Sequence, residues 1–158
     1  MLKKFLAVLA FIAVAIAGSI GKLIGETSSG SVALATPKQQ DVEAMVVEGF
    51  AKAAAQINRT LPKMIDEDTR VDNVTVGPGA RMVYHYTFPK YVSRDIDATW
   101  LSTTLRPDTM LKVCASREMK KSLQYGGVYA YSYSGNDRIK IAEFEIGRDD
   151  CGLPKISP

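Results

Sequence analysis

An apolar run near the N-terminus constrains this chain more than any other feature. The run extends without a charged residue from Phe5 to Ala17, follows two lysines, and ends in the small-x-small pattern Ala15-Ile16-Ala17. A charged start, an apolar stretch and a small-residue site are the three parts of a secretory signal peptide. A core helix would carry a polar face, and this segment has none. We therefore expect residues 1–25 to form a signal peptide or a membrane anchor.

The sequence does not decide whether this segment is cleaved. Apolar and small residues continue past Ala17, and the stretch from Phe5 to Ile24 is 20 residues long, enough to span a bilayer. Lys22 lies near the far end, where a lysine can reach the lipid interface. Cleavage after Ala17 gives a periplasmic or secreted protein. Retention leaves the domain anchored in the inner membrane, facing the periplasm in the cell envelope.

The cysteine content agrees with export. Cys114 and Cys151 are the two cysteines of the chain, and their spacing fits neither a zinc site nor a redox motif. In an oxidising compartment they can form one intramolecular disulfide. A bridge closing a loop of this length stabilises a domain by about 4 kcal/mol in the chain-entropy model. We expect a disulfide between these two residues.

The remaining sequence predicts one α+β domain over residues 37–158, after a flexible linker over residues 26–36. Helical periodicity or capping signals indicate helices at residues 38–59, 93–105 and 107–123, with Arg106-Pro107 separating the last two. Alternation and turn residues indicate strands at 69–76, 81–88, 128–133 and 138–146, and the apolar pattern of the last strand shifts phase, which indicates either a bulge near Ala142 or burial on both faces. We expect a four-stranded, mainly antiparallel sheet of two hairpins, with about three helices packed on one face.

Charge and residue types argue against several functions. Without the two N-terminal lysines the chain carries 18 basic and 17 acidic residues, too small an excess to indicate a nucleic-acid partner. His85 is the single histidine and lies within a predicted strand, far from any nucleophile motif. The sequence contains no metal-ligand set and no cofactor motif. We expect no enzymatic activity, with a hydrolase as the remaining enzyme alternative.

Tyrosines are the most distinctive candidates for a binding site. All seven lie between residues 84 and 133. Tyrosine favours strands, and cross-strand aromatic pairs stabilise sheets, so a structural role explains most of them. Tyrosine is also enriched at recognition surfaces. The sequence leaves open whether one row faces a partner; the candidate binding face comprises Tyr84, Tyr86, Tyr129, Tyr131 and Tyr133.

Several short motifs give the chain a resemblance to known proteins. They are Asn58, Leu61-Pro62, Asp66, Thr69-Arg70, Cys114 and Cys151. With these motifs, residues 40–151 resemble small exported or membrane-anchored proteins of Gram-negative bacteria. The resemblance implies an envelope location and a compact domain, and it implies no activity and no site.

Three functional hypotheses follow. The first is a non-enzymatic envelope protein that binds another protein in the periplasm, with the membrane as a second partner through residues 1–25. The second is a sensor domain that binds a small ligand or a peptide at the tyrosines. The third is an accessory protein of a secretion system, or a protein that neutralises a toxin.

Overall fold

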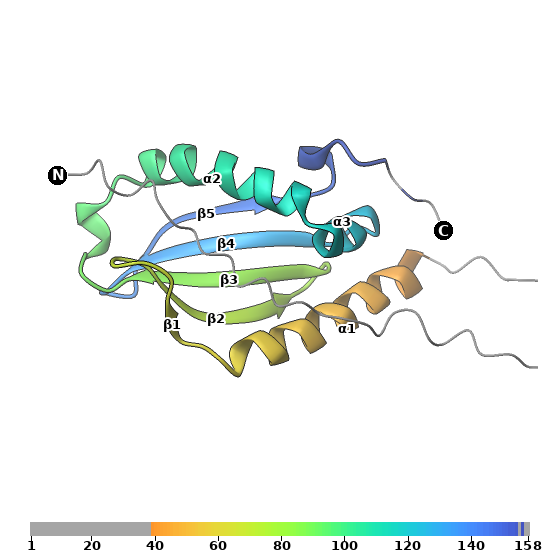
Figure 1. Cartoon of the computed structure of the whole chain (residues 1–158), viewed down its shortest axis with the longest axis horizontal. Coiled ribbons are helices and arrows are strands. Elements are labelled where there is room, and N and C mark those ends of the chain that lie inside the picture. The colour runs from red at the N-terminus through yellow and green to blue at the C-terminus, as the bar shows by residue number, and fades with distance from the viewer. Residues whose placement is uncertain (1–38, 155, 157–158) are drawn as a thin grey trace, which may run out of the picture.

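The computed structural model describes residues 39–154 and 156, so the predicted N-terminal segment, the linker and the expected helix start at Thr36-Pro37 lie outside the described residues. Figure 1 shows the elements in chain order. The helices are α1 (Gln39–Asn58), α2 (Ala98–Ala115) and α3 (Arg117–Gln124), and two 3-10 turns, η1 (Ser93–Asp95) and η2 (Asp149–Cys151), accompany them. The strands are β1 (Lys63–Met64), β2 (Arg70–Gly77), β3 (Arg81–Phe88), β4 (Val128–Gly135) and β5 (Lys140–Ile146).

The sheet has five strands in the order β1-β2-β3-β4-β5, which corrects the prediction of four. The additional strand, β1, pairs antiparallel with β2 through Lys63 and Met64. It follows Leu61-Pro62, where the residue before proline favours extended backbone. The two predicted hairpins, β2-β3 and β4-β5, are confirmed, but β3 and β4 pair in parallel, so the sheet is mixed. The bulge expected near Ala142 is present, because Tyr133 pairs with Ala142 whereas Ser134 pairs with Lys140.

Two helices differ from the prediction in a way that tertiary packing explains. Residues 93–95 form only a 3-10 turn, and α2 begins at Ala98, where the Asp97 side chain accepts a hydrogen bond from the Trp100 amide at 2.8 Å. The helix then continues through Pro107 and ends at Ala115, so the expected break at Arg106-Pro107 is wrong. Proline removes one hydrogen bond and crowds the preceding turn. Buried Leu101 and Val113, on either side of it, keep both halves of α2 against the core.

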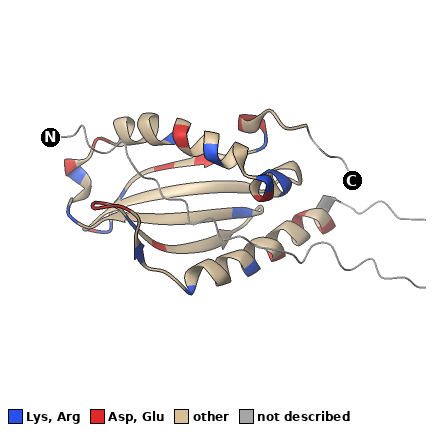
Figure 2. Cartoon of the chain, viewed as in Figure 1, with Lys and Arg blue, Asp and Glu red and all other residues tan. Residues whose placement is uncertain are grey.

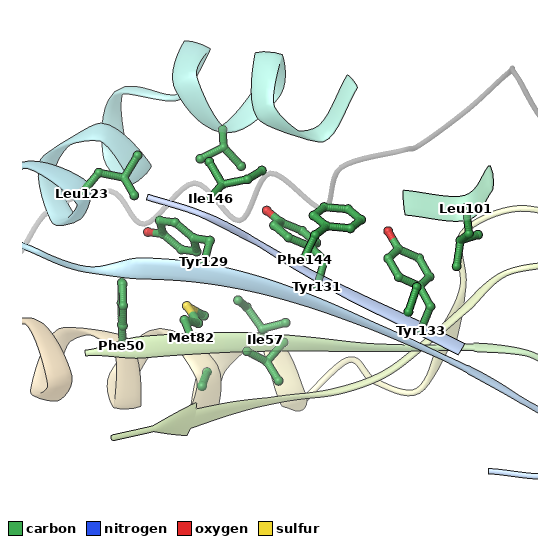
Figure 3. Close-up of a cluster of buried hydrophobic side chains, with 14 of the residues drawn as sticks. Phe50, Ile57, Met82, Leu101, Leu123, Tyr129, Tyr131, Tyr133, Phe144 and Ile146 are labelled. Carbon is green, nitrogen blue, oxygen red and sulfur yellow. The ribbon is translucent and has the colours of Figure 1, made fainter. Parts of the chain in front are cut away.

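One core lies between the sheet and the three helices. In-register pairing places Met82, Tyr84 and Tyr86 of β3 beside the tyrosines of β4 on a single face of the sheet. Figure 3 shows this face, with Phe50 and Ile57 of α1, Leu101 near the start of α2 and Leu123 of α3 around it. The predicted packing of helices on one face is therefore confirmed. The opposite face of the sheet carries mostly polar and charged side chains, including Arg81, His85 and Glu143.

The predicted disulfide is confirmed. Cys114, at the end of α2, bonds to Cys151 in η2, and the two Cα atoms are 5.3 Å apart. The bridge fastens the chain after β5 to α2, as does the ion pair between Arg106 and Asp150. Among the helices that the structure describes, none combines the length and apolar character needed to cross a membrane.

Candidate functional site

Four of the five tyrosines of the candidate binding face form one continuous aromatic row beneath the helices, and the ring of the fifth, Tyr129, lies 5.2 Å from that of Phe50 on α1. The parallel register aligns Tyr84 with Tyr131 and Tyr86 with Tyr133 across β3 and β4. Their rings stack, with centroids 5.4 Å and 4.9 Å apart in these two pairs. Phe144 of β5 extends the row through Tyr131 at 5.5 Å. Both tyrosine strands therefore face the same way, and the row is built as part of the core.

Exposure differs between the two strands. Tyr129, Tyr131 and Tyr133 are no more than 5% exposed, whereas Tyr84 and Tyr86 are half-buried. α1 packs mainly on β2, and α2 packs on β5, so these two helices lie over the flanking parts of the sheet. Tyr84 and Tyr86, on the central strand β3, are the two members of the candidate face that solvent reaches to a larger extent.

Burial also determines the acid–base behaviour of the row. Desolvation raises the pKa of Tyr84, Tyr86, Tyr131 and Tyr133 far above the usual value for a phenol, and neighbouring tyrosines add to the effect. For Tyr129, burial raises the pKa to about 12, against a smaller opposing effect of its hydrogen bond with Ser122. All five side chains are therefore neutral not only at physiological pH, as an ordinary phenol is, but also under more alkaline conditions.

The hydroxyl groups of the row are not equally satisfied. The Tyr129 hydroxyl lies 2.7 Å from Ser122 Oγ, and the Tyr84 hydroxyl has a weak contact with the Met82 sulfur at 4.0 Å. The buried Tyr131 hydroxyl has no hydrogen-bond partner among the described groups. A buried hydroxyl without a hydrogen-bond partner lowers the free energy of unfolding, so the Tyr131 hydroxyl destabilises the core.

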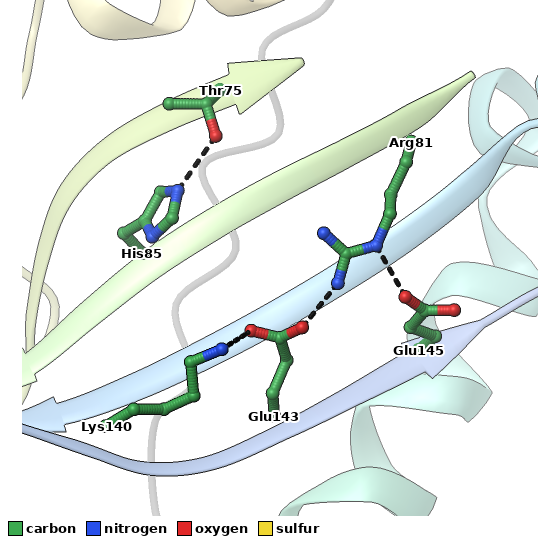
Figure 4. Close-up of polar contacts among 6 residues, drawn as sticks. All are labelled: Thr75, Arg81, His85, Lys140, Glu143 and Glu145. Atoms are coloured by element: carbon green, nitrogen blue, oxygen red, sulfur yellow. Dashed lines mark hydrogen bonds and ion pairs between the residues drawn. The ribbon is translucent and has the colours of Figure 1, made fainter. Parts of the chain in front are cut away.

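The opposite face of the sheet holds a network of charges (Figure 4). Arg81 extends from β3 across β4 and forms ion pairs with Glu143 and Glu145 of β5, and Lys140 binds Glu143 at 2.7 Å. The strand crossed by Arg81 presents Ala130 there, whose small side chain is fully buried. Hydrogen bonds from Lys140 and Arg81 lower the pKa of Glu143. Glu143 is therefore a carboxylate held by cations, unlike the raised-pKa acid of a glycosidase.

His85 lies on this same face without the contacts of a catalytic histidine. In the sheet register it is the neighbour of Ser132, whose other neighbour is Glu143, so the serine stands between the histidine and the carboxylate. A triad needs the histidine in the middle. The hydrogen bond of His85 is instead with Thr75, between Nε2 and Oγ1 at 2.8 Å, and burial lowers the pKa of the imidazole. The neutral His85 side chain therefore serves to link β2 and β3 through Thr75.

A shallow pocket lies beside the disulfide-linked end of the chain. It has a volume of about 320 Å³ and is lined by Gly126 to Val128, by Glu145 and by residues 147–150. Its acidic groups are engaged, because Asp150 accepts from the Gly147 amide and pairs with Arg106 while Glu145 pairs with Arg81. No group of three potential metal ligands occurs within residues 39–154 or at residue 156.

One local device was not foreseen in the sequence. The Asn58 side chain, at the end of α1, accepts from the Val74 amide and donates to the Val74 carbonyl, both at 2.8 Å. It thus takes the place of a neighbouring strand on the outer edge of β2. Asn58 is one of the short motifs in the sequence, but only the fold brings its side chain to a residue 16 positions away.

The fold is similar to that of exported bacterial proteins. No protein-family model matches the chain, and no curated protein is similar to it in sequence. A predicted secreted protein from Pseudomonas aeruginosa superposes with a TM-score of 0.61 at 17% identity, over 70% of this chain and 96% of that one.

Two further solved structures share the fold, and both belong to secretion systems. The pilotin EpsS of the Vibrio vulnificus type II secretion system has a TM-score of 0.58 at 12% identity, over 71% of this chain and 96% of its own. The type II secretion pilotin AspS of Vibrio cholerae has a TM-score of 0.55 at 10% identity, over 73% of this chain and 100% of its own. At these identities the comparisons establish the fold alone.

Proposed function

We propose that this protein is a non-enzymatic accessory of a secretion system in the bacterial cell envelope, and that it acts by binding another protein. The observation that supports the proposal is the extent of the structural likeness. The described domain matches nearly the whole length of two type II secretion pilotins, so no further domain is needed to complete their fold. Fold alone does not assign function, and the chain's own features must therefore point the same way.

Two features of the chain do so. The apolar segment from Phe5 to Ala17 has the composition of an export signal. The Cys114–Cys151 disulfide is typical of a protein that resides in an oxidising compartment. The periplasm provides such conditions, and a secretion-system accessory acts there or at its bounding membranes.

The charge network and the histidine favour binding over catalysis. Arg81 and Lys140 together neutralise Glu143 and Glu145, and His85 is hydrogen-bonded to Thr75, so the ionisable groups on this face of the sheet bind one another. Aromatic side chains, tyrosine among them, are enriched in the surfaces by which proteins bind one another. Tyr84 and Tyr86 are the candidate contact residues, because they combine ring area with partial exposure.

A sensor domain for a small ligand or peptide is the second candidate. The observation in its favour is the unsatisfied hydroxyl of Tyr131, which stacks against both Tyr84 and Tyr86. A polar atom of a bound molecule would satisfy this hydroxyl and recover its desolvation cost.

Site-specific photo-crosslinking in the native host tests the proposal. A photoreactive phenylalanine analogue replaces Tyr86, and a matched variant carries it at Asn136, an exposed residue of the β4–β5 turn. We expect the Tyr86 variant, and not the control, to crosslink a component of a secretion apparatus, and deletion of the gene to reduce export through that apparatus. Unchanged export after deletion, with no crosslink to such a component, would contradict the proposed function.

A further inference from the structure

The short helix α3 presents a basic face to the surroundings of the protein. Arg117, Lys120, Lys121 and Gln124 follow the spacing i, i+3, i+4, i+7 and therefore lie on one side of the helix. Buried Leu123 and the partly buried Met119 lie on the other side and pack into the core. Figure 2 shows the resulting concentration of basic residues on α3. Because its apolar side faces the core, α3 directs its basic side chains toward the solvent.

These cations differ from most others on the described surface in having no ion-pair partner there. Eight basic residues pair with acids: Lys52, Arg70, Arg81, Lys90, Arg94, Arg106, Lys140 and Arg148. None of the described acidic residues pairs with Arg117, Lys120 or Lys121. The one acid of α3, Glu118, lies near the Ser116 hydroxyl instead. The positive potential of this face is therefore not neutralised by contacts within the described domain.

The position of α3 relates this face to the N-terminal segment. Figure 1 shows α3 and the N-terminal end of α1 at the same end of the molecule. Gln39 begins α1, and 14 residues separate it from Ile24, the last residue of the apolar stretch. Such a connection spans at most about 50 Å. If the apolar stretch is retained in a bilayer, this connection limits how far the N-terminal end of α1, and α3 beside it, can lie from the membrane surface.

A tyrosine completes the surface. Tyr125 directly follows α3 and is 45% exposed. Tyrosine is enriched at membrane interfaces, because its ring enters the headgroup region while its hydroxyl remains hydrated. Clustered lysine and arginine beside such a ring are typical of segments that bind anionic lipids.

We propose that the basic face of α3, formed by Arg117, Lys120 and Lys121 with Tyr125 beside it, docks on a membrane surface containing anionic phospholipids. The occupant follows from charge complementarity and from the apolar stretch of the sequence that precedes α1. The docking fixes the orientation of the tethered domain, with the opposite end directed away from the bilayer. It is independent of the protein partner in the proposed function.

Reconstitution of the full chain tests the docking. The protein is placed in vesicles of phosphatidylcholine alone or mixed with phosphatidylglycerol, and a fluorescent amino acid at Gln124 reports quenching by nitroxide-labelled headgroups. We expect strong quenching only with phosphatidylglycerol and at low salt, because screening shortens the range of the interaction. The triple substitution R117Q/K120Q/K121Q should lower the docked-to-undocked ratio by about 100-fold, from the typical contribution of one basic residue near an anionic surface.

A matched variant separates docking from net charge. R59Q/K63Q/R138Q removes three cations that also form no ion pair with a described acid, from the C-terminal end of α1, from β1 and from the β4–β5 turn. We expect this variant to keep the quenching. Equal quenching in both lipid mixtures, an equal loss in both triple variants, or binding of α3 to duplex DNA or an acidic protein in preference to the anionic vesicles would overturn the proposal.

Discussion

Replacing Tyr131 with phenylalanine should stabilise the domain, although tyrosine to phenylalanine in a core usually does the opposite. The Tyr131 side chain is 2% exposed, and its hydroxyl has no hydrogen-bond partner within the described structure. A buried hydroxyl that lost its hydration without replacement costs roughly 1–3 kcal/mol. Phenylalanine keeps the ring stacking with Tyr84 and Phe144. We expect the free energy of unfolding to rise by about 1 kcal/mol.

Tyr129 provides the matched control, since it lies on the same strand and the same face. Its hydroxyl lies 2.7 Å from Ser122 Oγ, and the Ser122 hydroxyl itself donates to the Met119 carbonyl at 2.8 Å. Tyr129 is therefore the donor, and its loss removes a satisfied hydrogen bond. Tyr129→Phe should lower the free energy of unfolding by about 1 kcal/mol, so the two substitutions should differ by about 2 kcal/mol with opposite signs.

Urea unfolding followed by the fluorescence of Trp100, the single tryptophan, measures both changes. A stabilised Tyr131→Phe variant should show a higher denaturation midpoint with an unchanged slope. If Tyr131→Phe destabilises the protein as much as Tyr129→Phe does, the Tyr131 hydroxyl has a partner in the folded protein, and the reasoning about this group is refuted.

Three further predictions concern the same domain. The free energy of unfolding should fall above about pH 10, because burial raises the pKa of Tyr129 to about 12 in the folded protein. The stabilisation from Tyr129 is complete below the pKa of an unfolded tyrosine and is lost as the pH rises from that value through the folded one. Urea denaturation at stepped pH, with tyrosine absorbance to follow ionisation, measures this loss. Gly127→Ala should destabilise the domain by about 1–3 kcal/mol, because a Cβ there would lie 2.9 Å from both the Phe50 ring and a backbone oxygen. Gly49→Ala, which has open space on α1, should instead stabilise the domain by about 0.5–1 kcal/mol. Equal shifts of the melting temperature in the two variants would contradict this prediction. Asn58→Ala should cost about 1–2 kcal/mol and speed hydrogen exchange at the Val74 amide, and unchanged exchange would show that the edge contact is not formed.

The sequence predicts those elements whose signal is local. The apolar spacing of α1 gives the C-terminal end of that helix within one residue, and the alternation of β3 gives both ends of that strand, because each periodicity records which side of its own element is buried. The turns after Gly77 and Ser134 likewise give the two hairpins. The disulfide was predictable because two cysteines in an oxidising compartment allow one intramolecular pairing.

Features set by long-range contacts were missed. The parallel pairing of β3 with β4 joins residues about 47 positions apart, although a strand, helices and a second strand in succession are the general signal for such a crossover. That pairing decides where the tyrosines lie, because it aligns both rows on one face. β1 is too short for any periodicity, and Pro107 lies inside α2 because packing on both sides outweighs the local cost.

The fold also limits what partner binding can involve. Tyr129, Tyr131 and Tyr133 cannot contact a partner without rearrangement of α1 or α2, so a rigid-body complex would use Tyr84 and Tyr86 at most. The charge network on the opposite face is self-neutralised and offers little electrostatic attraction. The unpaired cations of α3 remain for a different occupant, which separates the membrane contact from the protein contact on the same small domain.

The redox state of the two cysteines in cells tests the central claim, that this domain works outside the cytoplasm. Cells of the native host are lysed under a thiol-blocking reagent, and the full chain is examined for mass-tag labelling before and after reduction. We expect Cys114 and Cys151 to react with the tag only after reduction. Free thiols at both positions in the native protein would contradict export, and with it the envelope function.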